Sequence, residues 1–394
     1  MTVKESKTKL KSGKARSRSA SSPDSAKDMT TVSLFTGGGG LDLGLEAVGW
    51  DIRFSTDIDP QSCITMQRGR AEAGRRGKGI LQNALVLRED VRELDGRFIF
   101  DAIDAKRGDV QLLTGGPPCQ AFSVFGKRIG RQDERGLLAY EYFRLLGQLE
   151  PEAFVFENVY GLLTVEGGQV FREVCARLAK PKPSLSYTIS VLRLNAADYG
   201  VPQFRDRVFI VGSRRGRKVS VPAPLTADPH ELLMNGVKPW RTVNDAMRDL
   251  PLIGAPYPAN HTGRNHSQRI IDRYAGMSAG ERDRHTRINK LDPARPSYTI
   301  IVGSDKGGGK GHIHPQEPRE VTPRESARIQ TFPDWWAFAG TVRHPIRQVG
   351  NAVPPLLGAA VGNAIRSQVF GLPEIPLKSV LETLDQQHLF EEEL

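Results

Sequence analysis

From residue 31 onward, short apolar runs alternate with longer amphipathic stretches. The apolar runs predict strands, and the stretches between them predict helices. We expect strands at 31–35, 51–55, 110–114, 153–157, 187–194 and 207–212, and helices at 41–48, from residue 60, at 136–149 and at 169–178. Strands that alternate with helices are typical of a parallel sheet with crossover helices. The pattern therefore predicts a doubly wound α/β domain.

The regular pattern stops after residue 212. Proline, glycine, histidine and arginine then dominate without sustained periodicity, apart from a short helix predicted in TVNDAMRDL at 242–250. Order returns near residue 323 with the helix-like PRESARIQTF, and residues 353–369 predict a long apolar helix that closes the chain. We therefore expect a second, irregular domain between these two parts.

The length of the chain supports two domains, since 394 residues exceed what one hydrophobic core usually organises. No apolar run approaches the about 18 residues of a membrane span, and the N-terminus has no segment of signal-peptide type. We expect a cytoplasmic protein. Its three cysteines are too few and too scattered for a disulfide framework or a Cys-x-x-Cys zinc site, so we expect no metal.

Charge is distributed unevenly along the chain, whose formal net charge is +10. Residues 1–29 carry eight basic and three acidic side chains, a net +5, and residues 374–394 carry one basic and six acidic side chains, a net −5. Residues 214–330 carry twenty basic and twelve acidic side chains, a net +8. Clustered Lys and Arg favour a polyanionic partner, and the ordinary alternative is a basic surface that only keeps the protein soluble.

A glycine-rich turn follows the first predicted strand. The segment at 33–44, SLFTGGGGLDLG, reads as a strand, a turn and a helix start, where a nucleotide-like ligand meets exposed backbone N–H groups. A dinucleotide fingerprint needs glycines at i, i+2 and i+5, but position i+5 from Gly37 is Asp42, which disfavours a nicotinamide-dependent oxidoreductase. An adenosyl ligand without phosphates fits better. Asp57 and Asp90, after the next two strands, are candidates to bind its ribose and adenine, or else to cap helices.

Two further strand ends carry candidate catalytic side chains. In GGPPCQAFS, two prolines stiffen the approach to Cys119 directly after a strand, so we expect a nucleophile rather than a buried structural cysteine. In AFVFENV, Glu157 ends an apolar strand, where partial desolvation raises a carboxyl pKa and favours proton donation at neutral pH. The alternative for Glu157 is an edge carboxylate paired with an arginine.

The segment QFRDR alternates at strand period. Gln203, Arg205 and Arg207 should therefore point to one face and Phe204 and Asp206 to the other. Three donors on one face suit a phosphate or a pyrimidine carbonyl, and a solvated strand face is the ordinary alternative.

The ordered series FTGGGG, PPCQAFS, FENV, QFRDR and QVGNAVPP resembles the motifs of the C5-cytosine DNA methyltransferase family, of the bacterial restriction-modification type. PPCQ and ENV in this order and spacing are highly specific, and the motifs cover residues 31–213 and 318–370. The resemblance implies a Rossmann-like methyltransferase domain that uses S-adenosylmethionine, plus a small irregular target recognition domain. It also implies methyl transfer to C5 of a cytosine flipped out of DNA, through a covalent bond from Cys119 to C6.

The resemblance also assigns roles position by position. It implies the catalytic set Cys119, Glu157, Arg205 and Arg207. It implies an S-adenosylmethionine pocket lined by Phe35, Gly37, Gly39, Asp57, Ile58, Asp90, Leu138, Asn351 and Val353. It implies substrate contacts from Gln120, Ser123, Lys127, Arg128 and Gln203, most of them in a segment that resembles the family's substrate-closing loop.

With these roles the chain divides into five parts. We expect a disordered basic tail at 1–29, the first part of the catalytic and cofactor-binding domain at 30–214, and the target recognition domain at 215–317. The catalytic domain returns at 318–373, and an acidic C-terminal tail follows at 374–394. Two features depart from the family pattern without removing a catalytic group. Thr36 stands where a smaller residue is commoner. The basic insert RGRAEAGRRGKG at 68–79 is expected to be a solvated loop, and the alternative is a segment that adds phosphate contacts.

Double-stranded DNA is the expected partner. Some family members with the same catalytic set methylate tRNA, but the long recognition segment at 215–317 favours DNA. A catalytically silent nucleic-acid-binding module is the other alternative, and the presence of Cys119 and Glu157 argues against it. We further expect a monomer, with a cognate restriction endonuclease that acts on the same site without direct contact.

Overall fold

The computed structural model describes residues 29–118, 138–230, 237–300, 311–341 and 343–390. In this part of the chain, seven strands form one sheet in the order β3-β2-β1-β4-β5-β7-β6. The strands are β1 Thr30–Leu34, β2 Asp51–Asp57, β3 Leu85–Arg88, β4 Leu112–Gly115, β5 Ala153–Val159, β6 Thr188–Asn195 and β7 Asp206–Ser213. Neighbouring strands are parallel, except that β7 runs antiparallel to both β5 and β6. The predicted α/β fold is confirmed, with a mixed rather than a purely parallel sheet.

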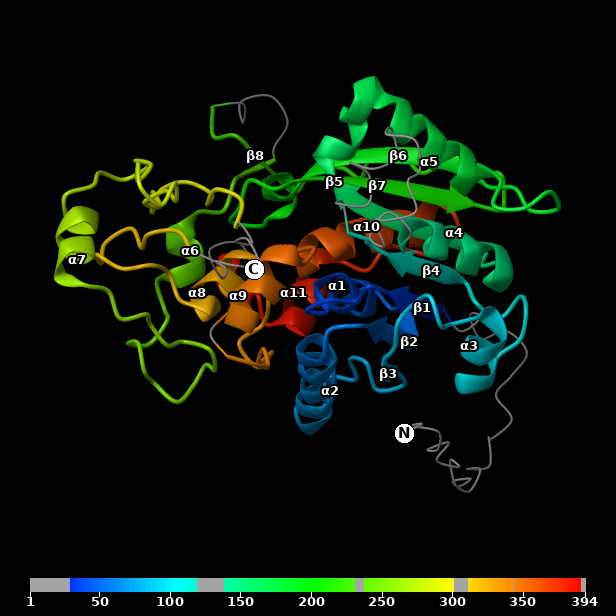
Figure 1. Cartoon of the computed structure of the whole chain (residues 1–394), viewed down its shortest axis with the longest axis horizontal. Helices are drawn as coiled ribbons and strands as arrows, with labels where there is room; N and C mark the ends of the chain where they lie inside the picture. Colours follow the sequence, from blue (N-terminus) through cyan, green and yellow to red (C-terminus); the bar gives the residue numbers. More distant parts are fainter. Residues whose placement is uncertain (1–28, 119–137, 231–236, 301–310, 342, 391–394) are drawn as a thin grey trace, which may run out of the picture.

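Helices cover both faces of this sheet (Figure 1). The main helices are α1 Gly40–Ala47, α2 Pro60–Arg75, α3 Gly96–Ala102, α4 Leu138–Leu149, α5 Gln169–Ala179, α8 Pro323–Ile329, α9 Arg343–Asn351, α10 Pro355–Gln368 and α11 Leu377–Leu384. Side chains alternate along β5, so Ala153 and Val155 join a core under α1, α2 and α10, whereas Phe154 and Phe156 join a core under α3, α4 and α5. None of the described helices is long and apolar enough to cross a membrane.

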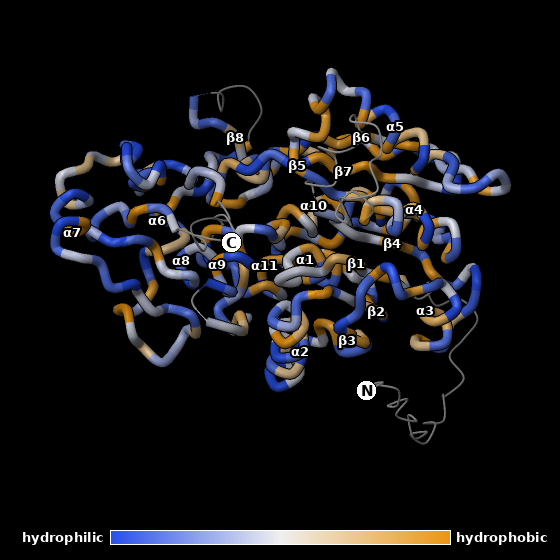
Figure 2. The backbone as a smooth tube through the Cα atoms, in the orientation of Figure 1, coloured by the Kyte–Doolittle hydropathy of each residue, from blue (hydrophilic) through white to orange (hydrophobic). Residues whose placement is uncertain are grey.

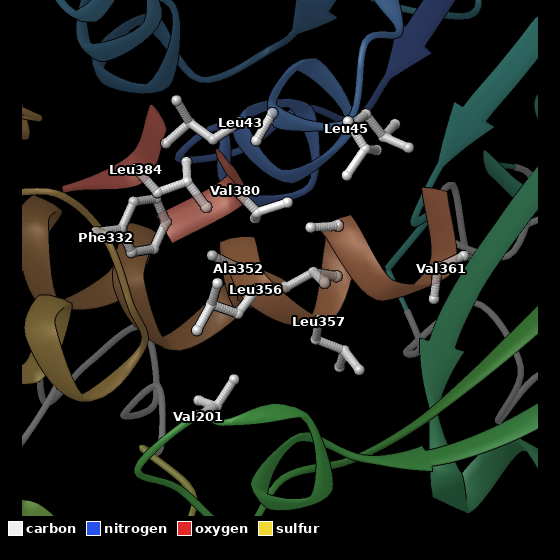
Figure 3. Close-up of a cluster of buried hydrophobic side chains, with 14 of the residues drawn as sticks. Leu43, Leu45, Val201, Phe332, Ala352, Leu356, Leu357, Val361, Val380 and Leu384 are labelled. Carbon is white, nitrogen blue, oxygen red and sulfur yellow. The ribbon is translucent and has the colours of Figure 1, made fainter. Parts of the chain in front are cut away.

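Helix α10 lies at the centre of the first core. It packs along α1, where a Cβ on Gly44 would lie 2.2 Å from the carbonyl oxygen of Pro355. Figure 3 shows Leu43 and Leu45 of α1 and Val380 and Leu384 of α11 on one side of Leu356 and Leu357, and Val201 on the other side. The long apolar helix predicted at 353–369 is therefore confirmed, and it begins at Pro355 because proline is well suited to the first turn of a helix.

The segment at 215–317 has little regular structure in its described part. It contains β8 Thr226–Ala227, β9 Lys238–Pro239, α6 Val243–Met247 and α7 Gln268–Ala275. The lobe around α7 is largely hydrophilic along its backbone (Figure 2) and has a small apolar cluster of its own, which includes Tyr274 and Ile313. Helix α6 instead places Val243 and Ala246 in the main core. This irregular lobe is thus anchored on the α/β body.

The expectation of a solvated loop at 68–79 is wrong for its first eight residues. Helix α2 continues to Arg75, because alanine and arginine in this stretch are good helix formers and Ala73 packs into the core. Gly69 lies directly against Trp336, since a Cβ there would come within 2.0 Å of the indole ring.

The expectation of an acidic tail at 374–394 is wrong for residues 377–390. Helix α11 buries an apolar face that includes Leu381 against the main core. Lys78 holds the end of this helix, because its Nζ donates to the carbonyl oxygens of Glu382 and Thr383 and contacts the Asp385 carboxylate at 2.6 Å. The high acidic content of the segment obscured the apolar spacing of one helical face.

Candidate active site

The glycine-rich turn after β1 adopts backbone conformations that favour glycine. Gly37 and Gly39 have φ angles of 54° and 82°, and the non-glycine residue Phe35 also has a positive φ of 55°. A Cβ on Gly37 would meet no atom within 4 Å, so this side of the turn is open. Thr36 ties the turn to β2, because its backbone N–H and its hydroxyl both donate to the Thr56 carbonyl oxygen, at 3.1 and 2.7 Å.

Asp57 ends β2 beside this turn. Its carboxylate accepts hydrogen bonds from the backbone N–H groups of Gly37 and Asp59, both at 2.8 Å. Burial raises the pKa of the Asp57 carboxyl, and these two hydrogen bonds oppose the shift. The next side chain, Ile58, is 60% exposed. An exposed apolar side chain beside a carboxylate and an open turn suits an adenosyl group, which needs an apolar surface for the base and acceptors for the ribose hydroxyls.

Asp90 lies after β3 and is already paired. Arg92 donates from Nε to both oxygens of the Asp90 carboxylate, at 3.0 and 2.9 Å. This guanidinium lowers the pKa of the Asp90 carboxyl. The predicted hydrogen bond from an adenine amino group to Asp90 would share the carboxylate with Arg92, and it stays a prediction.

The C-terminal part of the chain returns to the glycine turn through α9 and α10. A Cβ on Gly40 would lie 2.1 Å from the carbonyl oxygen of Val353. The segment 350–355, which we call the C-terminal return, therefore packs directly against the turn. Asn351 is exposed at the end of α9. Leu138 begins α4 and is half-buried. The structure therefore brings Val353 to the turn, and the roles of Leu138 and Asn351 in a pocket stay predictions.

Glu157 and Arg207 meet at the ends of adjacent strands. Antiparallel pairing of β5 with β7 sets Arg207 opposite Val159, two residues from Glu157 on the same face. The Arg207 Nε lies 3.0 Å from Glu157 Oε1, and the two side chains are only 11% and 12% exposed. Burial raises the pKa of the Glu157 carboxyl, and the nearby charges of Arg207 and Arg205 oppose the shift. Burial thus favours the protonated form of this carboxyl, and the two arginines favour the charged form.

The same strand end supports the segment that leads to the predicted nucleophile. The Asn158 side chain donates from Nδ2 to the Pro117 carbonyl oxygen at 3.1 Å. A Cβ on Gly116 would come within 2.5 Å of Glu157 Oε2, so the backbone passes close to this carboxyl. Five predicted residues that follow lie outside the described residues: Cys119, Gln120, Ser123, Lys127 and Arg128.

Gln203, Arg205 and Arg207 are buried, whereas Phe204 is half-buried and Asp206 is exposed, as the predicted alternation requires. Their side chains nevertheless have different partners. The fully buried Gln203 accepts a hydrogen bond from the Ile300 backbone N–H at 3.1 Å. Arg205, also fully buried, donates from Nη2 to the carbonyl oxygens of Gly350 and Ala352, at 2.7 and 2.8 Å.

Arg205 is therefore anchored to the C-terminal return, whereas Arg207 contacts Glu157. Its two acceptors flank Asn351 in the sequence, so it fixes the backbone of the return on either side of that residue. Its Nε and Nη1 atoms have no hydrogen-bond partner within the described residues. The catalytic role that the resemblance assigned to Arg205 stays a prediction. Gln203 instead connects to the recognition segment at 215–317 through its hydrogen bond with Ile300.

Asp42, which stands beneath the glycine turn, was not predicted from the sequence as part of the site. This buried carboxyl accepts hydrogen bonds from Ser33 at 2.6 Å and from Ser55 at 2.9 Å, and so joins α1 to β1 and β2. Burial raises the pKa of Asp42 to about 7, although both hydroxyls oppose the shift. An acidic residue within the apolar pattern of LDLGLEA was the available sequence signal.

Comparisons with known proteins agree with this arrangement. A family model described as C-5 cytosine-specific DNA methylase matches residues 29–367. The type II methyltransferase M.XorII of Xanthomonas oryzae is 31% identical over 391 residues, which cover 88% of this chain and 86% of that protein. The type II methyltransferase M1.HphI of Haemophilus parahaemolyticus is 32% identical over 351 residues, which cover 86% of each protein.

Solved structures show the same fold. A prophage-encoded Escherichia coli protein, described as a DNA modification methyltransferase, superposes with a TM-score of 0.66 at 26% identity. The match covers 86% of this chain and 99% of that chain. The Dnmt2 methyltransferase of S. pombe superposes with a TM-score of 0.56 at 16% identity, over 86% of this chain and 98% of that one, and supports the fold alone.

Proposed function

Since this chain belongs to the C-5 cytosine-specific DNA methylase family, and is a DNA cytosine-5-methyltransferase that uses S-adenosylmethionine, we propose that it acts through a covalent bond between Cys119 and cytosine C6. The observation that carries this proposal is the buried pair of Glu157 and Arg207 beside the backbone of Gly116 and Pro117. That backbone leads directly to Cys119.

S-adenosylmethionine is proposed to bind at the glycine turn. The open side of Gly37 leaves room for a ligand against the backbone. The Asp57 carboxylate offers acceptors for two ribose hydroxyls, and the exposed Ile58 offers an apolar surface for the adenine. Bound there, the cofactor supplies an electrophilic methyl group. The residues of this turn bind and orient it.

C5 of cytosine is a poor nucleophile. Cys119 is proposed to activate C5 by adding to the neighbouring C6. Addition of the thiolate to C6 forms an S–C6 bond and moves the C5–C6 electron pair to C5. C5 could then take the methyl group that S-adenosylmethionine would supply, and the sulfonium sulfur would keep the electron pair of the broken methyl–sulfur bond. After methylation, a base removes the C5 proton. The electron pair returns to the C5–C6 bond and the Cys119 thiolate leaves.

Glu157 and Arg207 are proposed to hold the base during this sequence. A protonated Glu157 donates to ring N3 of cytosine, which draws electrons from C6 and favours thiolate addition. The raised pKa of the Glu157 carboxyl supports this protonation state. The Arg207 Nε lies 3.0 Å from Glu157 Oε1, which holds the guanidinium beside this carboxyl. The guanidinium is proposed to donate a hydrogen bond to the neighbouring O2 of the base.

The substrate is proposed to be a cytosine flipped out of double-stranded DNA, because a base inside a duplex cannot reach a buried carboxyl. The recognition segment at 215–317 is proposed to read the flanking sequence in the major groove. Its basic side chains suit phosphate contacts. It is joined to the catalytic strand end, since the Phe204 N–H donates to the Ser297 carbonyl oxygen at 2.8 Å and the Thr299 hydroxyl donates to that of Phe204 at 2.6 Å.

The proposed function is tested with radiolabelled S-adenosylmethionine, unmethylated genomic DNA and total tRNA, followed by nucleoside analysis and bisulfite sequencing. We expect label in 5-methylcytosine of DNA at one short sequence. Label in tRNA alone would refute the DNA substrate. The Cys119→Ala variant should lose methyl transfer and retain DNA binding, and turnover by that variant would remove Cys119 from the mechanism.

Two partner proposals go with this function. A cognate restriction endonuclease is proposed to cut the same site without contacting this protein, as the type II methyltransferase relatives suggest. A monomer is proposed because one active site modifies one cytosine at a time. Protection of methylated DNA from restriction digestion tests the first proposal, and sedimentation equilibrium tests the second.

A further inference from the structure

Three aromatic side chains of one short segment pack against three consecutive glycines of the turn. Cβ atoms added to Gly38, Gly39 and Gly40 would come within 3.3, 2.8 and 2.9 Å of Phe338, Trp336 and Phe332, respectively. The segment 332–338 therefore forms the floor beneath the glycine turn. A Cβ at Gly39 or Gly40 would therefore require the aromatic ring to shift together with the Met66 side chain or the Val353 backbone, which lie at 2.3 and 2.1 Å.

Trp336 also makes a hydrogen bond to the glycine turn. Its Nε1–H donates to the Gly38 carbonyl oxygen at 2.9 Å, and its side chain is fully buried. A buried hydrogen bond of this kind fixes the plane of the Gly38–Gly39 peptide, and so the direction of the N–H groups that follow the open Gly37. On its other side the indole ring rests on α2 at Gly69, where a Cβ would come within 2.0 Å of Cζ3.

The backbone of the segment is itself fixed from outside. The buried Arg324 donates to the carbonyl oxygens of Pro333 and Trp336, at 3.0 and 2.6 Å. The Asn260 side chain makes two hydrogen bonds with the Phe338 backbone, at 2.9 and 2.8 Å. The floor therefore has little freedom to move, and the indole of Trp336 is held in place from both ends of the segment.

We propose that Trp336 is a positioning residue for S-adenosylmethionine, which sets the glycine turn through the hydrogen bond to Gly38 without touching the cofactor. This inference rests on the proposed binding of the cofactor at Gly37. Neighbouring Trp335 provides a matched control, because it is also buried but its Nε1 has no hydrogen-bond partner within the described residues. Phenylalanine at either position removes a similar volume, and only Trp336→Phe removes a hydrogen bond to the turn.

The test measures cofactor binding by isothermal titration calorimetry and steady-state kinetics with the full chain. Trp336→Phe should weaken S-adenosylmethionine binding about five-fold, the loss expected from one net hydrogen bond. The loss should fall on KM for the cofactor and not on kcat. Trp335→Phe should bind the cofactor like the parent while losing comparable stability in urea. Equal dissociation constants in the two variants, or a fall in kcat at unchanged KM, would overturn the inference.

Two further variants distinguish a failure of the inference about Trp336 from a failure of the proposed cofactor site. Gly69→Ala retains the indole N–H group but displaces the Trp336 ring from the side of α2, and so moves this donor relative to the Gly38 carbonyl oxygen. It should also weaken cofactor binding, and normal binding would count against the inference. Ile58→Ala removes an exposed side chain without disturbing the floor. If Ile58→Ala binds the cofactor normally, the proposed cofactor site fails and the inference fails with it. If only Ile58→Ala is weakened, the inference about Trp336 fails alone.

Discussion

Arg205 and Arg207 stand two residues apart, and the structure gives them different tasks. Arg205 donates from Nη2 to the carbonyl oxygens of Gly350 and Ala352, at 2.7 and 2.8 Å. Arg207 instead contacts Glu157 at 3.0 Å. Replacing each arginine with methionine, which keeps much of the side-chain length without the charge, should separate the two roles.

The magnitude for Arg205 follows from its contacts. A hydrogen bond from a charged donor contributes about 1.5–3 kcal/mol, so loss of two would cost about 3–6 kcal/mol. Part of this cost is offset, because a buried guanidinium carries a desolvation penalty and two of its nitrogens have no hydrogen bond within the described residues. We therefore expect Arg205→Met to lower the free energy of unfolding by about 2 kcal/mol, and to weaken cofactor binding about ten-fold by releasing the return at Asn351.

Arg207→Met should behave in the opposite way. Loss of the Arg207 charge removes an interaction that lowers the pKa of Glu157, so burial then raises this pKa further and favours the neutral carboxyl more strongly. We expect a change of less than about 1 kcal/mol in unfolding free energy, because neutralisation relieves the unpaired charge. Turnover should fall about 10²- to 10³-fold, because a donor aimed at the base is lost.

Urea unfolding, calorimetric titration of S-adenosylmethionine and single-turnover methyl transfer distinguish these outcomes. We expect Arg205→Met to lose stability and cofactor affinity, and Arg207→Met to lose the chemical step. If Arg205→Met retains stability and cofactor affinity but loses the chemical step at saturating cofactor, Arg205 contacts the base and the positioning role is refuted.

Three further predictions concern side chains around the same site. Glu157→Gln should lower kcat about 10²- to 10⁴-fold with DNA affinity unchanged, measured by single-turnover methyl transfer; near-normal turnover would exclude proton donation by Glu157. Asp42 has a folded pKa raised to about 7 from 3.8, so its contribution to stability is present at acid pH and is lost as pH rises from about 4 through about 7. The free energy of unfolding in urea should therefore fall less between pH 5 and pH 8 for Asp42→Asn than for the parent. Equal falls in the two proteins would contradict the shifted pKa. Gly69→Ala should destabilise the protein by about 1–3 kcal/mol through overpacking against Trp336, whereas Gly74→Ala in the same helix meets only the flexible Gln82 side chain and should stabilise it by up to about 1 kcal/mol.

Most of the sheet could be predicted from local pattern. The apolar runs at 31–35, 51–55 and 153–157 coincide with β1, β2 and β5, because a buried strand needs an apolar run whatever surrounds it. The reversed direction of β7 was not predictable in this way. Strand direction depends on which neighbour a strand pairs with, and periodicity within a segment carries no such information.

The sequence by itself determined the order of the motifs, the chemistry of their side chains and the placement of Asp57 and Glu157 at the ends of strands, because these follow from residue type and local period. Only the tertiary structure decided which side chains meet. Gly350 and Ala352 come to Arg205, and Trp336 comes to Gly38, across 145 to 298 residues of chain. Such contacts arise when α10 and the segment 332–338 pack against α1 and the glycine turn, and no local pattern encodes that packing. Two arginines that looked alike in QFRDR were separated for the same reason, since one faces the C-terminal return and the other faces Glu157.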